Sequence, residues 1–201
     1  MHITSEEQLR ELYGYPKGRA KNKQLPSLER HSINFIEHAP FVTIATRAKT
    51  GLVDCSPRGG EPGFVKIVNK NCIVFPDSKG NKRLDSLINI VETGDIGCLF
   101  LIPGIDETLR VNGVARISTN AEYLGLFLNE QNPPKTCIEL TITEVFMHCA
   151  KALMRSELWS AESQIDRALL PTMGKMVNDQ LCISDTPESQ KDMLARYASD
   201  L

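Results

Sequence analysis

Two adjacent cations, Lys82 and Arg83, stand where the sequence predicts the start of a helix, in the stretch PDSKGNKRLDSLINIVETGD. Apolar residues recur there at the spacing of one helical face, which predicts a helix over 82–92. The residues expected on its buried face are Leu84, Leu87, Ile88 and Val91. The amino end of a helix has positive character, so each cation costs about 0.3–1 kcal/mol in that position. A bound anion would offset this cost.

An anion site at this position would use backbone and side-chain donors together. Gly80 gives the chain freedom to turn, and Asn81 is a suitable N-cap for the helix. The free N–H groups of a helix start and two charged side chains suit a phosphate. In the plain alternative both cations are solvated, with Lys82 paired to Asp85 or Ser86 on the surface. The sequence leaves both interpretations open.

A second candidate feature is the predicted strand TLRVNGVARIS, residues 108–118. Alternation places Thr108, Arg110 and Asn112 on one face of this strand and apolar residues on the other. An arginine in the middle of a strand is seldom left unpaired against a core, so Arg110 faces either water or a ligand. Its face is then either the outside of a barrel or a polar wall for a bound anion or ring.

The segment SPRGGEPGFVKI, residues 56–67, contains three glycines near two cations. It lacks the GxxxxGKS/T pattern of a phosphate-binding loop and the strand–loop–helix context of a dinucleotide fingerprint. The glycines are therefore typical of a turn or bulge between strands. Arg58 and Lys66 remain candidate anion contacts.

The chain has 201 residues, a net charge of −2 and a hydrophobic fraction of 41%, which fits one globular domain. This charge balance argues against nonspecific nucleic-acid binding, and no run of 18 apolar residues predicts a membrane span. The first residues lack the layout of a signal peptide, so the six cysteines are expected as free thiols in the cytoplasm. The four histidines form no ligand cluster, so no metal site is predicted.

The elements expected around these residues are mainly strands. Helices are predicted over 5–13 (capped by Thr4 or Ser5), 28–39 (capped by Ser27), 82–92 and near 120–130. Strands are predicted over 41–48, 52–57, 63–68, 72–75, 96–104, 108–118 and 136–149. Six or seven strands with short links suggest an antiparallel barrel rather than a βαβ sheet. The tail over 150–201 is expected to be helical, with Ser160 and Thr186 as caps.

Three segments follow one another in a fixed order: a strand with a lysine, a hairpin partner followed by a basic loop, and a polar-faced strand ending in Asn-Gly. This order resembles that of the pyridoxamine 5′-phosphate oxidase-like family of FMN-binding split barrels. The segments that carry the resemblance are DCSPRGGEPGFVKI, FPDSKGNKRLDSLINI, PGIDETLRVNGVARIS and FMHCAKALMRSELW, which are similar to an oxidase-related subgroup without an assigned function. The resemblance covers residues 28–160.

This resemblance implies a mainly β fold with helices, an antiparallel split β-barrel with α+β elements at both termini. Its domains would be an N-terminal helix and basic connector over 1–26, the FMN-binding split barrel over 27–160 and a C-terminal helical extension over 161–201. It also implies a homodimer that holds two FMN molecules at the subunit interface.

The cofactor-binding residues implied by the resemblance follow the family's motifs. The strand lysine that binds phosphate falls on Lys66, the loop positions after the next strand fall on Asp77 and Asn81, and the basic pair falls on Lys82 and Arg83. The glutamine that contacts the isoalloxazine in the oxidases falls on Thr108, a departure for which Arg110 could compensate.

Late residues of the second subunit also contact the flavin in these oxidases. Arg155 and Trp159, or His148 and Lys151, could serve in their place here, although no shared motif fixes the match. The arginine–histidine element that binds pyridoxamine phosphate has no counterpart in the sequence HCAKALMRSELW. A true pyridoxamine phosphate oxidase is therefore disfavoured, and no catalytic residue is assigned.

The resemblance thus implies an FMN-dependent oxidoreductase that acts on an unidentified small molecule, with NADH or NADPH as candidate reductants. Three alternatives stay open. The protein could be a non-catalytic flavin-binding or sensing protein, or a heme- or deazaflavin-binding split barrel with His148 as a candidate heme ligand. It could also be a structural or interaction domain that uses the barrel without a cofactor.

Overall fold

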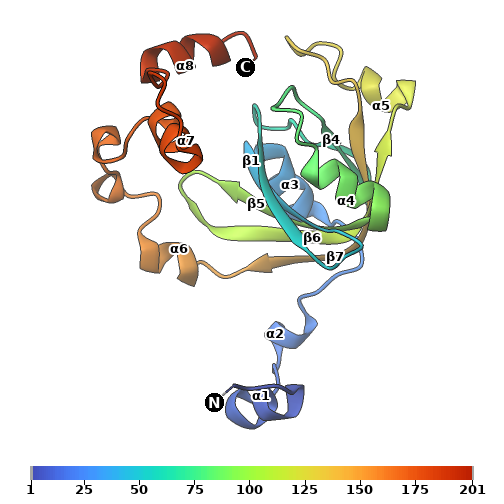
Figure 1. The fold of residues 1–201 in the computed structure, drawn as a ribbon. Coiled ribbons are helices and arrows are strands. Elements are labelled where there is room, and N and C mark those ends of the chain that lie inside the picture. Colours follow the sequence, from blue (N-terminus) through green and yellow to red (C-terminus); the bar gives the residue numbers. More distant parts are fainter. Residues whose placement is uncertain (1, 201) are drawn as a thin grey trace.

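The computed structural model describes residues 2–200, and its centre is one seven-stranded antiparallel sheet (Figure 1). The strands follow the order β2-β1-β5-β6-β7-β4-β3. Edge strands β2 and β3 do not pair with each other, so the curled sheet remains open along one seam. The predicted antiparallel split barrel is confirmed. The strands are β1 (Phe41–Arg47), β2 (Val53–Gly59), β3 (Lys66–Asn69), β4 (Cys72–Pro76), β5 (Asp95–Ile102), β6 (Ile105–Ser118) and β7 (Cys137–His148).

Residues 2–200 also form eight α-helices. They are α1 (Glu6–Tyr13), α2 (Arg19–Asn22), α3 (Arg30–His38), α4 (Asp85–Thr93), α5 (Ala121–Gly125), α6 (Lys151–Ser156), α7 (Met173–Leu181) and α8 (Gln190–Tyr197), with short 3₁₀ turns at Ala161–Ser163 and Arg167–Leu169. Helices α3 and α4 lie against the barrel, whereas α1 and α2 extend away from it and α6 to α8 form an arm on one side (Figure 1). No helix of residues 2–200 is long and apolar enough to cross a lipid bilayer.

Alternate strand residues fill the inside of the barrel. In β1 the inward residues Val42 and Ile44 are fully buried, and in β6 the same holds for Leu109 and Val111. Each such side chain stabilises the fold by about 1.5–3 kcal/mol relative to an exposed position. Helix α3 adds two more buried hydrophobic side chains to this core, so the core joins both sheet and helix.

Helix α4 differs from its prediction in its start and in its buried face. It begins at Asp85 rather than at 82, because Lys82 and Leu84 have φ angles of 64° and 61° that a right-handed helix excludes. Three of the four residues predicted to be buried are at least half exposed, namely Leu84 at 51%, Ile88 at 50% and Val91 at 75%. Both parts of the prediction are therefore wrong.

The buried face of α4 is partly polar. Ser86 Oγ donates a hydrogen bond to the Asp54 carboxylate at 2.5 Å, and Asn89 Nδ2 donates to Thr46 Oγ1 at 3.0 Å. Buried polar groups need such partners, and these two lie on β2 and β1. Hydrogen bonds to the sheet, rather than hydrophobic periodicity alone, therefore set the rotation of α4.

Helix caps agree with the sequence in part. Ser5 caps α1 and Ser160 caps the turn at Ala161–Ser163, as predicted. Helix α3 is capped by Glu29 rather than Ser27, because the Glu29 carboxylate accepts two backbone N–H groups at 2.8 Å each. Helix α8 begins after Ser189 rather than Thr186.

The longest strand pair, β6 with β7, contains one irregularity at Gly113. The register shifts between Asn112 and Gly113, and the backbone of β7 passes so close that a Cβ at Gly113 would lie 2.1 Å from the Thr141 carbonyl oxygen. A real Cβ never approaches a backbone oxygen so closely. The bulge therefore requires glycine at this position.

We predict that Gly113→Ala destabilises the protein by about 2–3 kcal/mol, because the β6–β7 backbones must separate to admit the methyl group. The midpoint of urea unfolding measures this change. Gly125→Ala is the matched control, since a Cβ there meets no atom within 4 Å and its φ is ordinary. A Gly113 variant as stable as the Gly125 variant would contradict the clash.

Candidate cofactor site

The loop between β4 and α4, residues 77–84, contains the basic pair. Asn81 does not cap α4; its Oδ1 accepts the backbone N–H of Arg83 at 3.1 Å and so closes a turn inside the loop. Within residues 2–200, the backbone N–H groups of residues 78–82 donate no hydrogen bond to other protein groups. Five successive free donors and the exposed cation Lys82 therefore face solvent together.

Arg83 is already paired with a carboxylate. Its Nε donates to Asp85 Oδ2 at 2.8 Å and its Nη2 to Asp85 Oδ1 at 3.4 Å, which raises the pKa of Arg83. The side chain of Arg83 is 72% exposed, so this contact is weak in free energy and easily exchanged for another anion. The surface pairing expected for Lys82 is thus made by Arg83.

Two further predicted residues come together across the barrel. Arg58 in β2 lies near enough to Asp77, directly after β4, for its positive charge to act on that carboxylate. Burial raises the pKa of Asp77, and the charge of Arg58 and the hydroxyl of Thr136 oppose this shift. The Asp77 backbone N–H also donates to the Thr136 carbonyl at 3.1 Å. Arg58 and Asp77 therefore both lie beside the basic loop.

Lys66 points elsewhere. Its Nζ donates to the Gly63 carbonyl at 2.9 Å and lies 5.7 Å from the centre of the Phe127 ring, beyond α5. The same charge opposes a rise in the pKa of Glu130 that is caused by burial. No direct contact between Lys66 and the basic loop is formed within residues 2–200.

Taken together, these donors fit an anionic group better than a neutral one. Free backbone N–H groups can bind phosphate, and nearby guanidinium and ammonium groups strengthen the contact. The carboxylates Asp54, Asp77 and Asp85 balance the cations around the loop. A phosphate would therefore have to displace Asp85 from Arg83 or share that arginine with it.

A second polar cluster lies on the outer face of β6 and β7. Arg110 Nη2 donates to Glu144 Oε1 at 2.6 Å, and Asn112 Nδ2 donates to the same oxygen at 3.1 Å. Gln24, from the connector before α3, donates to Glu144 Oε2 at 2.6 Å. Arg110 thus faces a protein carboxylate, a partner that the sequence alone did not reveal.

The aromatic ring of Phe146 is also part of this second cluster. The Arg110 guanidinium lies 3.9 Å from the centre of the Phe146 ring and Lys23 lies 4.8 Å from it, while the His148 ring packs at 4.8 Å. Arg110 Nε is buried and makes no hydrogen bond within residues 2–200. The Arg110 side chain as a whole is 37% exposed, so part of it remains open to a ligand. Thr108, which pairs with His148 in the ladder, is buried.

The register of the sheet fixes the distance from the start of the basic loop to the second cluster within one protomer. Pro76, next to the basic loop, pairs with Cys137, whereas Arg110 pairs with Phe146 at the other end of β7. Cys137 and Phe146 lie nine positions apart, which corresponds to about 30 Å of strand. The other end of the loop reaches β2, where Ser86 bonds to Asp54 and the charge of Asp54 acts on Arg83, so this separation does not apply to the basic pair. Within residues 2–200, no hydrogen bond or ion pair joins Thr108 or Arg110 to Lys82 or Arg83, which the resemblance grouped in one site.

The late-chain candidates lie at the base of the arm. Trp159 Nε1 donates to the Ile105 carbonyl at 2.9 Å, which anchors it to β6 of its own protomer. Lys151 and Arg155 in α6 are exposed and form no side-chain hydrogen bond or ion pair with residues 2–200. They are free to contact a ligand or a partner.

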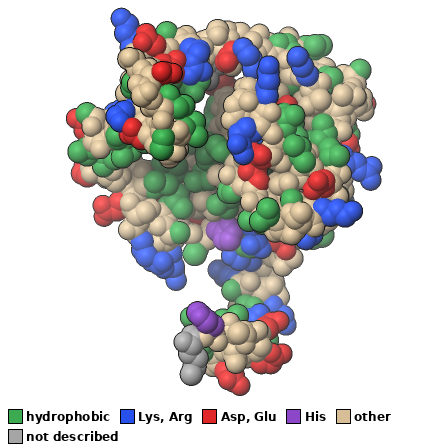
Figure 2. Space-filling view, viewed as in Figure 1, with side chains coloured by type: hydrophobic (Ala, Val, Ile, Leu, Met, Phe, Trp, Pro, Cys, Tyr) green, Lys and Arg blue, Asp and Glu red, His purple; other side chains and the backbone are tan. Residues whose placement is uncertain are grey.

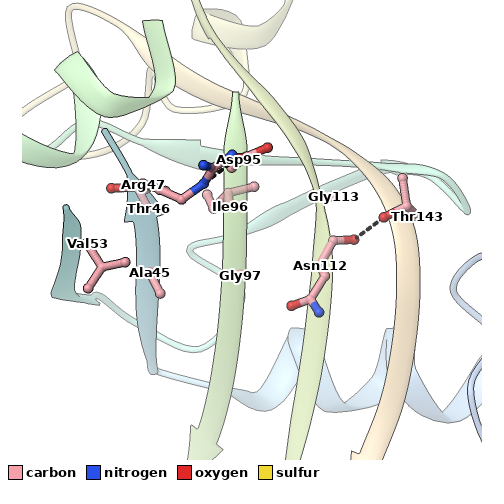
Figure 3. A pocket seen from close by; sticks show the side chains of 10 residues that line it. All are labelled: Ala45, Thr46, Arg47, Val53, Asp95, Ile96, Gly97, Asn112, Gly113 and Thr143. Atoms are coloured by element: carbon pink, nitrogen blue, oxygen red, sulfur yellow. Dashed lines mark hydrogen bonds and ion pairs between the residues drawn. The ribbon is translucent and has the colours of Figure 1, made fainter. Parts of the chain in front are cut away.

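The structure also contains a pocket that the sequence analysis did not identify. It has a volume of ≈ 350 Å³ and lies open on the outer face of the sheet over the bulge at Asn112 and Gly113, with the Arg47–Asp95 ion pair at one side (Figure 3). None of the predicted cofactor residues lines it. Only long-range strand pairing brings its residues together, so no local motif could have predicted it.

We predict that His148 titrates below the ordinary histidine pKa of about 6.5, because burial and the charges of Arg110 and Lys23 disfavour its protonated form. Between the folded and unfolded pKa values the unfolded chain binds more protons, so the free energy of unfolding decreases as the pH falls through this window. A titration followed by NMR of the ring protons measures the pKa. Lys23→Met should move the pKa of His148 upward, and an unchanged value would contradict this electrostatic account.

Comparisons with other proteins place this fold in a family. Comparison with curated proteins gives no match. HupZ from Group A Streptococcus is 16% identical, covering 60% of this chain and 93% of that one, with a TM-score of 0.50. A protein from Lactobacillus delbrueckii named as a pyridoxamine 5′-phosphate oxidase is 17% identical over 62% and 98% of the two chains, with a TM-score of 0.48.

The FAD binding protein from Mycobacterium smegmatis is 13% identical over 62% and 97% of the chains, with a TM-score of 0.43. At 16% identity, the HupZ structure indicates the fold alone. The family model of pyridoxamine 5′-phosphate oxidase matches residues 28–149, from the segment before α3 to the end of β7. The match covers more than half of the sequence, so the chain belongs to the pyridoxamine 5′-phosphate oxidase family.

Proposed function

We propose that the protein binds FMN through its phosphate at the loop of residues 77–84 and is an FMN-dependent oxidoreductase of the cytoplasm. The observation that carries the proposal is the row of free backbone N–H groups at 78–82 next to Lys82 and Arg83. Membership in the family supports a flavin rather than another anionic ligand. The six unpaired cysteines are typical of a reducing compartment.

The residues present fit the phosphate end of the flavin. Lys82 has no side-chain partner within residues 2–200, and Arg83 has only an exposed contact with Asp85 to exchange. Arg58 contributes a further positive charge from β2, and Lys66 lies on β3, the edge strand on the other side of the open seam. When bound, FMN would supply the redox chemistry, and these side chains would fix its position and balance its charge.

We further propose a homodimer in which each flavin lies between subunits. Within one protomer, no hydrogen bond or ion pair joins the basic pair to the cluster at Arg110 and His148 among residues 2–200. A second copy could bring its own Arg110 cluster to the ring of a flavin whose phosphate is bound by the first. Arg110, whose side chain is 37% exposed, would then present part of its guanidinium to that ring.

The proposal is tested first by colour and turnover. The absorbance spectrum of freshly purified protein, with mass spectrometry of what heat releases, should identify FMN. NADH or NADPH should then bleach the spectrum faster than free FMN under the same conditions. A bound flavin without accelerated reduction would support a flavin-binding or sensing protein, and a heme spectrum or a colourless protein that ignores added FMN would reject the proposal.

We predict that Lys82→Ala combined with Arg83→Ala weakens FMN binding by about 100-fold, because two charge-assisted hydrogen bonds to phosphate are lost. Quenching of FMN fluorescence during titration measures the dissociation constant. Lys17→Ala with Arg19→Ala removes the same charge from the exposed connector and is the matched control. Equal affinity in both double variants would refute the phosphate assignment.

A further inference from the structure

The C-terminal arm, residues 150–200, is the part of the molecule that its own barrel leaves uncovered. No residue of the arm is buried. Eleven large hydrophobic side chains along it are more than a third exposed, including Leu169 at 69% and Leu181 at 63%. The family match ends at residue 149, so this surface lies outside the shared domain.

The arm nevertheless has a defined structure. Thr172 caps α7, and its hydroxyl also donates to the Glu188 carbonyl at 3.3 Å, while Arg196 on α8 forms a double hydrogen bond with the Glu188 carboxylate at 2.8 and 2.9 Å. A Cβ at Gly174 would lie 2.8 Å from the backbone of Glu188, so α7 packs closely on that segment. Polar contacts thus order α7 and α8 relative to each other, while their hydrophobic side chains stay exposed.

Both ends of the arm are attached to the barrel of the same chain. Trp159 Nε1 donates to the Ile105 carbonyl near the start, and at the end Lys79 pairs with Asp200 at 2.5 Å. Asn132 also donates to the Ser199 carbonyl at 3.3 Å. Between these points the arm stands away from the sheet, and hydrophobic side chains gather around the hollow that separates them (Figure 2). The arm therefore cannot fold onto its own barrel without releasing one end.

The amount of exposed surface calls for a partner. The chain exposes 14044 Å², whereas a compact monomer of 22.4 kDa exposes about 9,400 Å². The excess of about 4,600 Å² is shared by the N-terminal helices and the arm, and it suffices for an obligate homodimer interface, which buries roughly 2,000–5,000 Å² in total.

The barrel of the same chain has exposed apolar surfaces that the arm of a second copy could cover. Helix α4 exposes Ile88 and Val91, Leu84 directly before it is also exposed, and the outer sheet exposes Val53 at 80%. In a dimer with two-fold symmetry, the arm of each copy would cover the apolar surface of the other. The assembly would then be closed, with no arm left unpartnered.

We propose that the arm is a clasp for a second copy of this chain. Part of the partner's barrel enters the hollow between arm and sheet, and the hydrophobic side chains of residues 158–194 cover it. The inference extends the proposed homodimer but does not depend on flavin. It assigns the 51 residues of 150–200 to subunit association, in addition to contacts between the barrels.

The test combines Leu169→Asp with Leu181→Asp in the full-length chain. Both side chains lie mostly in solvent within one protomer, so the variant should fold, and its far-ultraviolet circular dichroism should match the native protein. Light scattering should give 44.8 kDa, twice the 22.4 kDa of one chain, for the native protein. The variant should dissociate about a hundredfold more readily, because four desolvated leucines are lost per dimer.

Two controls separate charge from hydrophobic contact. Leu169→Met with Leu181→Met keeps apolar side chains and should remain dimeric, and Gln164→Asp adds charge at an exposed polar position and should also remain dimeric. Hydrogen exchange of the α7 amides gives a second readout, since they should be protected only in samples concentrated enough to be dimeric.

A native monomer, or a double-aspartate variant with unchanged mass and unchanged α7 protection, would overturn the clasp. The absorbance spectrum is recorded on the same samples. If the protein is yellow and the double-aspartate variant remains dimeric, the clasp is rejected and the flavin proposal stands. If the protein is colourless and the double-aspartate substitution dissociates its dimer, the clasp stands and the flavin proposal is rejected.

Discussion

Strands β6 and β7 form a ladder from the pair Thr108–His148 to the pair Ser118–Cys137, and the other parts of the molecule attach to this ladder. β5 extends the sheet on one side and β4 on the other, so the ladder sets the curvature of both halves. The arm leaves from the carboxyl end of β7. The bulge at Gly113 bends the ladder at the pocket on the outer face, and the close approach to Thr141 makes that bend specific.

The charges of the candidate site are nearly balanced before any ligand arrives. Arg83 forms an ion pair with Asp85. The positive charges of Arg58 and Lys66 stabilise the half-buried carboxylates of Asp77 and Glu130, respectively. The exposed Arg83–Asp85 pair contributes little to folding, so exchanging its carboxylate for a phosphate costs the fold little. A loop with free backbone donors and loosely held cations can thus accept an anion without rearranging the sheet.

The fold was largely readable from the sequence because it depends on local signals. Alternation in 108–118 and 136–149 predicted the two central strands, and the short links predicted an antiparallel barrel. The face of α4 was misjudged because Ser86 and Asn89 have partners on β1 and β2, which lie more than 30 residues away in sequence. Its start was misplaced because positive φ angles at Lys82 and Leu84 leave no apolar signature. The Arg110–Glu144 pair and the pocket were not predicted because they depend on the register between distant strands, which the pattern of a single segment does not specify.

The connector before α3 has a further role through Leu25. Its backbone exchanges two hydrogen bonds of 2.8 Å with Val145, on the side of β7 that β4 no longer covers beyond Thr141. Unpaired strand edges recruit other strands and lead to aggregation. Together with the hydrogen bonds of Lys23 and Gln24 to the same strand, this bridge covers the unpaired edge of β7. A chain shortened to begin at residue 28 would keep the whole family domain but would leave that edge open to pairing with other strands.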